Sequence, residues 1–148
     1  MNEIAEPKED NAALLLRLLR LGFILGGTIS IAIGLWMVID PAGWYSLFPG
    51  YIKDFGPQND HFIRDLGGWY AAGGALLLMA AGNPRRLGGV ALVVNLISVG
   101  AHAAEHLAEV FTGAVGAKHL IIDAPGVLFP FIILVVMTWI WWNLQSKT

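Results

Sequence analysis

The chain contains no cysteine and few charged residues. Without cysteine it cannot form disulfides, thiolate nucleophiles, CxxC redox motifs, Cys-ligated zinc sites or Cys-ligated iron–sulfur clusters. Any bound metal would need histidine and carboxylate ligands. Charged residues make up 14% of the 148 residues and the net charge is −2. The chain therefore lacks the basic field that nucleic-acid binding requires, and we expect no nucleic-acid partner.

Apolar residues dominate the composition. Hydrophobic residues account for 56% of the chain, six tryptophans are present, and the mean hydropathy is +0.63. A water-soluble fold of this length could not bury so much apolar surface in one small core. The composition predicts an integral membrane protein that lies in the lipid bilayer.

Four segments are long enough to cross a bilayer, which takes about 20 helical residues. The predicted spans are 21–39, 60–82, 87–112 and 119–142, within one transmembrane domain of residues 13–143. Polar tails of residues 1–12 and 144–148 flank this domain. Asp40-Pro41 ends the first span. The loop of residues 42–59 that follows carries aromatic residues suited to a membrane interface: Trp44, Tyr45, Phe48, Tyr51 and Phe55.

Short connections after the second and third spans make neighbouring helices antiparallel. The predicted fold class is therefore all-α, an up-down four-helix bundle in the membrane. Most basic residues fall on the side of the chain termini, against Lys53 and Lys118 on the other side: Lys8, Arg17, Arg20, Arg85, Arg86 and Lys147. The positive-inside rule then places both termini in the cytoplasm. We expect the membrane to be a bacterial or archaeal inner membrane.

Small residues and prolines shape the predicted helices. Three pairs of small residues would let helices approach closely: Gly22 and Gly26, Gly68 and Ala72, and Gly73 and Gly74. Pro125 and Pro130 fall within the fourth span. Because proline has no backbone N–H, they predict a kink there.

Ionisable residues inside the spans follow helical spacing, which places each group on one helix face. The groups are His61, Arg64 and Asp65 in the second span, His102, Glu105, His106 and Glu109 in the third, and His119 and Asp123 in the fourth. All three groups fall toward the non-cytoplasmic side of the predicted bundle. They include every histidine of the chain. We expect them to form a polar funnel that opens to the outside.

Ionisable groups at this depth cost roughly 2.5–3.5 kcal/mol each, so they should face the bundle interior and pair with one another. Three interpretations remain open. The groups could form an interhelical hydrogen-bond network that only holds the helices together. They could bind a metal, or they could bind a proton-coupled or quinone-like small molecule without a metal.

The metal interpretation depends on His102, His106 and Glu105 as ligands, with His61 or His119 completing the set. Imidazole and carboxylate bind divalent transition metals such as zinc, iron and copper, and di-metal helix bundles place His and Glu one turn apart. Residues 102–106 also fit the HxxEH string of inverzincin metalloproteases, a string short enough to occur by chance. A haem held by histidines of different spans is another form of this interpretation.

One stretch of the second span resembles a known family. The run His61-Phe-Ile-Arg64-Asp65-Leu-Gly67-Gly68-Trp-Tyr-Ala-Ala-Gly73-Gly74-Ala, after a first span that ends in Asp40-Pro41, is similar to the small four-helix membrane proteins of the DoxX-like group. In that group an arginine and one or more glycines open the second helix. The resemblance implies a four-helix membrane fold. Because some members are subunits of quinone-linked oxidoreductases, it also implies a redox role, although the His102-Glu105-His106 cluster departs from the pattern of the group.

Our first functional hypothesis is a membrane protein whose polar funnel holds a metal or a small redox-active molecule. His102 and His106 would be ligands or proton carriers. The catalytic candidates are Glu105 as co-ligand or base, Arg64 as the group that holds a carboxylate or anionic substrate, and Asp65. If the protein is an enzyme, we expect a membrane oxidoreductase or a metal-dependent enzyme.

The remaining candidates would bind the cofactor from the rim of the funnel. These are His61, His119 and Asp123, with Asp65 and Asp123 orienting the histidines as carboxylates do for metal-bound imidazoles. The second hypothesis is a non-catalytic accessory subunit, in which the same residues form a hydrogen-bond network. Its partners would be a second copy of the chain or a larger membrane complex.

Overall fold

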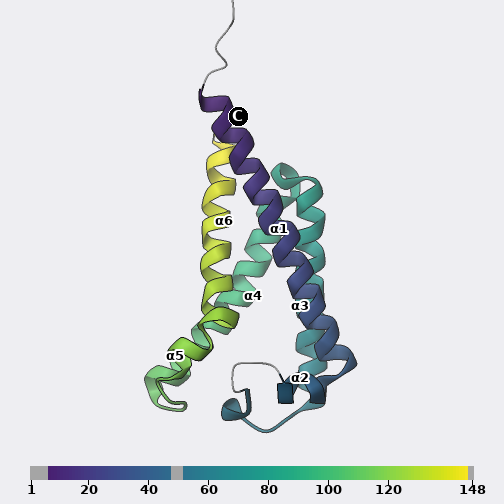
Figure 1. The fold of residues 1–148 in the computed structure, drawn as a ribbon, viewed down its shortest axis with the longest axis vertical. Coiled ribbons are helices and arrows are strands. Elements are labelled where there is room, and N and C mark those ends of the chain that lie inside the picture. Colours follow the sequence, from purple (N-terminus) through teal and green to yellow (C-terminus); the bar gives the residue numbers. More distant parts are fainter. Residues whose placement is uncertain (1–6, 48–51, 147–148) are drawn as a thin grey trace, which may run out of the picture.

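The structure is a computed structural model that describes residues 7–47 and 52–146. All regular elements in these two ranges are helical (Figure 1). In chain order they are α1 (Pro7–Ile39), α2 (Pro41–Leu47), the 3-10 helix η1 (Ile52–Phe55), α3 (Asp60–Gly82), α4 (Pro84–Thr112), α5 (His119–Ile122), the π-helical segment η2 (Ala124–Leu128) and α6 (Phe129–Gln145). The all-α prediction is confirmed for the described residues.

The four long helices α1, α3, α4 and α6 run in alternating directions. The start of α1 and the end of α6 lie at one end of the molecule, and α2 and α5 lie at the other (Figure 1). The most extensive packing is between α1 and α3, followed by α4 with α6 and α3 with α4. Two helix pairs therefore face each other, and the short elements gather at the end away from the termini.

Three described helical segments are long and apolar enough to cross a membrane: Asn11–Ile39, Pro84–Thr112 and Ala124–Gln145. They correspond to the first, third and fourth predicted spans. The second predicted span, α3, has 23 residues, but its glycines and Asp65 make it less apolar. The described helices are compatible with a multi-pass membrane protein.

The structure changes some of the predicted boundaries. Residues 7–12, which we expected in the polar tail, are the first turns of α1. Pro7 is tolerated at a first helical position and Lys8 and Glu9 are good helix formers, so the helix needs no apolar residues there. The predicted loop of residues 42–59 contains α2 and η1, whereas Phe48 and Tyr51 lie outside the described residues, as do residues 1–6 and 147–148.

Helices α1 and α3 approach each other through two pairs of glycines. A methyl group added at Gly34 would lie 2.5 Å from the carbonyl oxygen of Gly67, and one added at Gly27 would lie 2.8 Å from the carbonyl oxygen of Gly74. The two glycines of each helix are seven residues apart, which is about two turns, so they share one face. Such close backbone packing is typical of small residues in membrane helices. Gly68, by contrast, would place its methyl group in open space.

The apolar core lies toward the end of the molecule that carries the termini. Leu19 and Phe23 of α1, Leu92 of α4 and Leu144 of α6 are almost fully buried there. At the same end the indole N–H of Trp141 donates to the carbonyl oxygen of Pro84 at 3.1 Å, which ties α6 to the start of α4. The helices are therefore joined firmly at this end, and the internal space of the molecule lies at the other.

The fourth predicted span is broken into three pieces. α5 ends at Ile122, η2 widens the backbone to π-helical spacing, and α6 begins at Phe129. Pro125 and Pro130 have no backbone N–H to donate, which accounts for the loss of regular α-helical hydrogen bonds in this segment. The kink predicted from the sequence is this break. The break sets α5 at an angle to α6 (Figure 1), and it places His119 and Asp123 beside the end of α4.

Replacing Gly67 with alanine should destabilise the protein. The added methyl group would lie 2.7 Å from the carbonyl oxygen of Gly34, so the two helices must separate, at an expected cost of about 1–3 kcal/mol. Unfolding in mixed detergent–SDS micelles, followed by circular dichroism, measures the change. The control is Gly68→Ala on the same helix, which should leave the stability unchanged or raise it, since alanine favours helix. Equal stability of the two variants would contradict the glycine contact.

Candidate functional site

A pocket of about 400 Å³ lies at the end of the molecule away from the termini. Its wall is formed mainly by apolar and aromatic side chains of α1, α2, η1, α3 and η2, among them Ile33, Met37, Trp44, Phe55 and Tyr70. The polar residues on the wall include His102 and His106 of α4 and Asp123 before η2. The pocket is thus apolar over most of its surface and has a polar side built from two histidines and a carboxylate.

The two histidines of α4 lie one turn apart on the face that borders the pocket. Their ring centroids are 4.6 Å apart and their planes are nearly perpendicular, at 79°. The spacing i, i+4 brings both imidazoles to the same face, as the sequence predicted. The histidine pair predicted in the third span therefore reaches the interior of the molecule.

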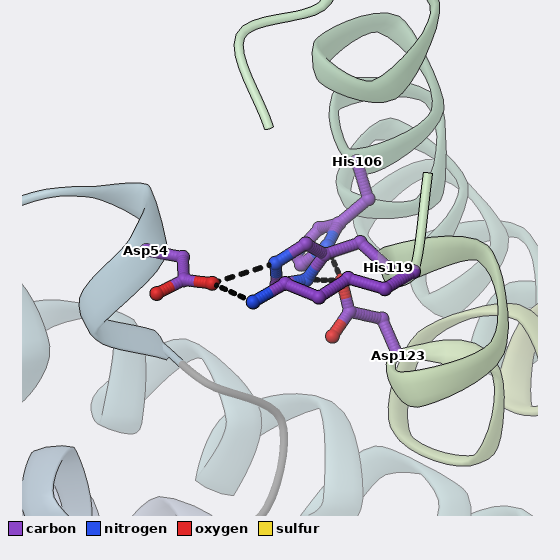
Figure 2. A network of polar contacts seen from close by, with 5 residues as sticks. Asp54, His106, His119 and Asp123 are labelled. Atoms are coloured by element: carbon purple, nitrogen blue, oxygen red, sulfur yellow. Dashed lines mark hydrogen bonds and ion pairs between the residues drawn. The ribbon is translucent and has the colours of Figure 1, made fainter. Parts of the chain in front are cut away.

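Asp123 joins the α4 histidines to the histidine of α5. Its Oδ2 atom accepts from Nδ1 of His106 at 3.1 Å and from Nδ1 of His119 at 2.9 Å (Figure 2). The side chain of His119 is fully buried, and that of Asp123 is 6% exposed. One buried carboxylate oxygen therefore links two helices that are separated by a loop in the sequence.

A second carboxylate extends this network to the surface. Oδ2 of Asp54, in η1, lies 3.1 Å from Nε2 of His119 and 2.7 Å from Nζ of Lys118. Figure 2 shows the His119 ring held between Asp54 on one side and Asp123 on the other. The side chains of Asp54 and Lys118 are 39% and 54% exposed. We call Asp54, His119, Asp123 and His106 the acid–imidazole chain.

The aromatic ring of Phe55 packs against the same histidines. Its centroid lies 4.5 Å from that of His106 and 4.8 Å from that of His119. Phe55 also lines the pocket. Because Asp54 and Phe55 are adjacent in η1, this short helix is held to the network by an ion pair and by ring contacts, and it closes one side of the pocket.

The hydrogen bonds limit where protons can reside in the acid–imidazole chain. Carboxylate oxygens only accept, so each imidazole nitrogen that faces an ionised aspartate must carry a proton. Both nitrogens of His119 face a carboxylate oxygen. Consequently either His119 is an imidazolium or one of the flanking aspartates is protonated. In both cases the acid–imidazole chain holds one proton more than it would with neutral histidines and ionised aspartates.

Asp54, at the surface end of the acid–imidazole chain, is stabilised in its ionised state by its neighbours. The hydrogen bond from the Lys118 ammonium, followed by that from His119, lowers the pKa of Asp54 below its ordinary value of 3.8. The Asp54 carboxylate is therefore negative at neutral pH and can accept from His119.

The group predicted in the second span does not join this network. The side chains of His61 and Asp65 are 90% and 62% exposed, with 3.4 Å between Nε2 and Oδ2, and Arg64 is also exposed, its Nε donating to the carbonyl oxygen of Val38 at 3.3 Å. Our expectation that all three groups face the interior was wrong for this one. Packing of Gly67 on α1 turns the face of α3 that carries His61 and Asp65 outward, while Arg64 lies at the edge of the contact and reaches back to Val38 of α1.

Glu105 also lies apart from the two histidines. It is exposed, because α4 is rotated so that Ala103 and His106 face the interior and Glu105 falls at the outer edge of the same helix face. Among the described residues, no group of three or more histidine, aspartate or glutamate side chains has a geometry that could hold a metal ion. Two of the nearby imidazoles already use Nδ1 on Asp123. The side-chain arrangement therefore favours hydrogen bonding over the predicted metal ligation by His102, His106 and Glu105.

The sequence did not single out Asp54, Phe55 and Lys118 as site residues. Asp54 and Phe55 lie in a loop segment with no helical periodicity, and Lys118 lies in the connection before α5. Their sequence signal was limited to an aspartate beside an aromatic residue in an interfacial loop. Only the position of η1 against α4 and α5 brings Asp54 and Phe55 to the histidines, whereas Lys118 directly precedes His119 in the sequence.

Comparison with protein-family models, curated proteins and solved structures finds no match for this chain. The functional argument therefore depends on the geometry of the site.

Replacing Asp123 with asparagine should destabilise the protein by about 1–3 kcal/mol, because the imidazoles of the buried His119 and the partly buried His106 lose their carboxylate partner. The free energy of unfolding in mixed micelles measures this change. Asp65→Asn is the matched control, since that carboxylate is mostly exposed, and we expect it to have little effect. A stability for Asp123→Asn equal to that of the control would show that Asp123 does not hold the network together.

Proposed function

We propose that this chain is a multi-pass membrane protein that binds a lipophilic small molecule of the quinone class in the pocket between its helices. One observation carries the proposal, namely a mainly apolar pocket of about 400 Å³ that borders two histidines and a carboxylate. Small-molecule sites typically measure about 300–1,000 Å³ and combine apolar walls with a few polar groups. A quinone fits such a pocket, because it combines an apolar ring and tail with two carbonyl oxygens that accept hydrogen bonds.

His106 is suited to both redox forms of such a ligand. Its Nδ1 is engaged by Asp123, which holds the ring in one orientation and leaves Nε2 on the opposite side of the ring. A neutral His106 would accept at Nε2 from a hydroquinone hydroxyl, and an imidazolium would donate to a quinone carbonyl. His102 stands next to it as a second imidazole on the pocket wall.

We further propose that the four long helices form a membrane four-helix bundle with both termini in the cytoplasm. Two observations support this arrangement: the alternating helix directions (Figure 1) and the basic residues near the end of the molecule that carries the termini. The acid–imidazole chain would then face the non-cytoplasmic side. The resemblance of the second span to DoxX-like proteins supports the same fold and a quinone-linked role.

The orientation can be tested by single-cysteine labelling, because the natural chain has no cysteine. Gln58→Cys lies in the loop before α3 and Ser146→Cys lies just after α6, and both positions are exposed. In intact spheroplasts, a membrane-impermeant maleimide should label Gln58→Cys and should label Ser146→Cys only after permeabilisation. The reverse labelling pattern would place the termini outside.

Quinone binding should quench the fluorescence of the purified protein in detergent, since Trp44 lines the pocket. A short-chain ubiquinone analogue is the probe. His106→Gln should weaken its binding roughly tenfold, which corresponds to the loss of one hydrogen bond of about 1.4 kcal/mol. His61→Gln is the matched control, because the side chain of His61 is 90% exposed and does not line the pocket.

An accessory role is the second candidate function. It is favoured by the attachment of η1 to α5 through Asp54, Lys118 and His119, because the same contacts would hold the fold together without any ligand. In that case the wild-type protein would show no saturable quenching by the quinone analogue. Loss of binding in His61→Gln to the same extent as in His106→Gln would likewise contradict the proposed site.

A further inference from the structure

We propose that the acid–imidazole chain is a proton path between the pocket and the aqueous surface at η1. The inference deepens the proposed function, because it assigns to the pocket a ligand that exchanges protons. It depends on four side chains from three parts of the sequence: Asp54 of η1, His119 of α5, Asp123 after α5 and His106 of α4.

The exposed fractions of the four side chains are those expected of a path that connects the protein surface to the pocket. The side chain of Asp54 is 39% exposed, those of His119 and Asp123 are 0% and 6% exposed, and that of His106 is 18% exposed. His106 and Asp123 line the pocket, and Asp54 and His119 do not. His119 and Asp123, in the middle of the path, are therefore shielded from the aqueous surface. Asp54 meets that surface at one end, and His106 borders the pocket at the other.

Each link of the path is a contact short enough for proton transfer. The distances are 3.1 Å from His106 to Asp123, 2.9 Å from Asp123 to His119 and 3.1 Å from His119 to Asp54. Imidazole can take up a proton at one ring nitrogen and release another from the second nitrogen, and a carboxylate can do so at one oxygen. The path therefore has no link that can only donate or only accept.

The proton balance closes along these contacts. The starting state has ionised Asp54, and one proton shared between Oδ2 of Asp123 and Nδ1 of His119. A proton taken up from the pocket by Nε2 of His106 sends the Nδ1 proton to Asp123. The shared proton then moves fully onto His119, whose Nε2 proton passes to Asp54 and from there to water. One proton enters and one leaves, and the histidines return to the starting state by exchanging their protonated nitrogens or by the reverse passage.

The neighbouring charges fit this path. Lys118 donates to Asp54 at 2.7 Å and stabilises its ionised form, so Asp54 releases a proton readily to water. His102 stands beside His106 on α4, and no carboxylate other than Asp123 contacts His106 in the described residues. Among the described residues, His106 therefore has one carboxylate to which it can pass a proton, that of Asp123.

A pH-jump experiment on the ligand-free protein in lipid nanodiscs tests the path. The protein carries isotope-labelled histidine in a His61→Gln background, so the remaining histidines belong to the path or contact it. Time-resolved infrared spectroscopy follows histidine protonation after release of caged protons. Asp54→Asn should slow this protonation by at least about tenfold, because it removes the group that exchanges protons with water. Added formate should restore the rate, since Asp54 is exposed and a small acid can replace it.

Two matched variants separate proton transfer from structural support. Lys118→Met removes the ion pair but keeps the carboxylate of Asp54 and its contact with His119, so it should slow histidine protonation much less than Asp54→Asn does. Asp60→Asn changes an acidic residue at the start of α3, outside the path, and should have no effect. An unchanged or faster rate in Asp54→Asn, or equal slowing in Lys118→Met, would overturn the proposal. Because no quinone takes part, a failure of quinone binding would be recognised separately.

Discussion

The site depends on one buried carboxylate oxygen that accepts from two imidazoles. Asp123 lies in a predominantly apolar molecule, where an ionised group without hydrogen-bond donors is strongly disfavoured. His106 and His119 supply these donors at 3.1 and 2.9 Å. The need to satisfy this carboxylate joins α4 to α5, and through His119 it also joins α5 to Asp54 in η1. Asp123 therefore joins α4, α5 and η1 in one polar network, which the ring of Phe55 supports by packing on His106 and His119.

The prolines of the fourth predicted span allow α5 to turn so that His119 and Asp123 meet the end of α4. A continuous helix from His119 onward would keep the start of the span in line with α6. The π-helical segment η2 interrupts the regular bonding and lets α5 turn. Residues of η2 also line the pocket. The same backbone break therefore helps to position the polar groups and to form the apolar wall beside them.

Close packing of α1 on α3 decides which groups stay outside the site. Gly67 and Gly74 bring the backbones of the two helices together, so Asp65 points outward from the opposite face of α3 and Arg64 stays at the edge of the contact, beside Val38 of α1. Both residues lie in the first turns of α3, near the end of the helix. The glycine contact thus sets the rotation of α3, and that rotation separates the two groups of ionisable residues.

The sequence by itself determined the helical class, the bounds of α3, the break caused by Pro125 and Pro130, and the presence of His102 and His106 on one helix face. These features follow from apolar composition, from residues that cannot continue a helix, and from spacing along a single helix. Only the tertiary structure decided which faces meet. Periodicity fixes the relative positions of side chains on one helix but not the rotation of that helix against its neighbours, so Arg64, Asp65 and Glu105 were placed wrongly. It also carries no information on loops, so Asp54 and Phe55 were recognised only once η1 was seen to pack against His119 and His106.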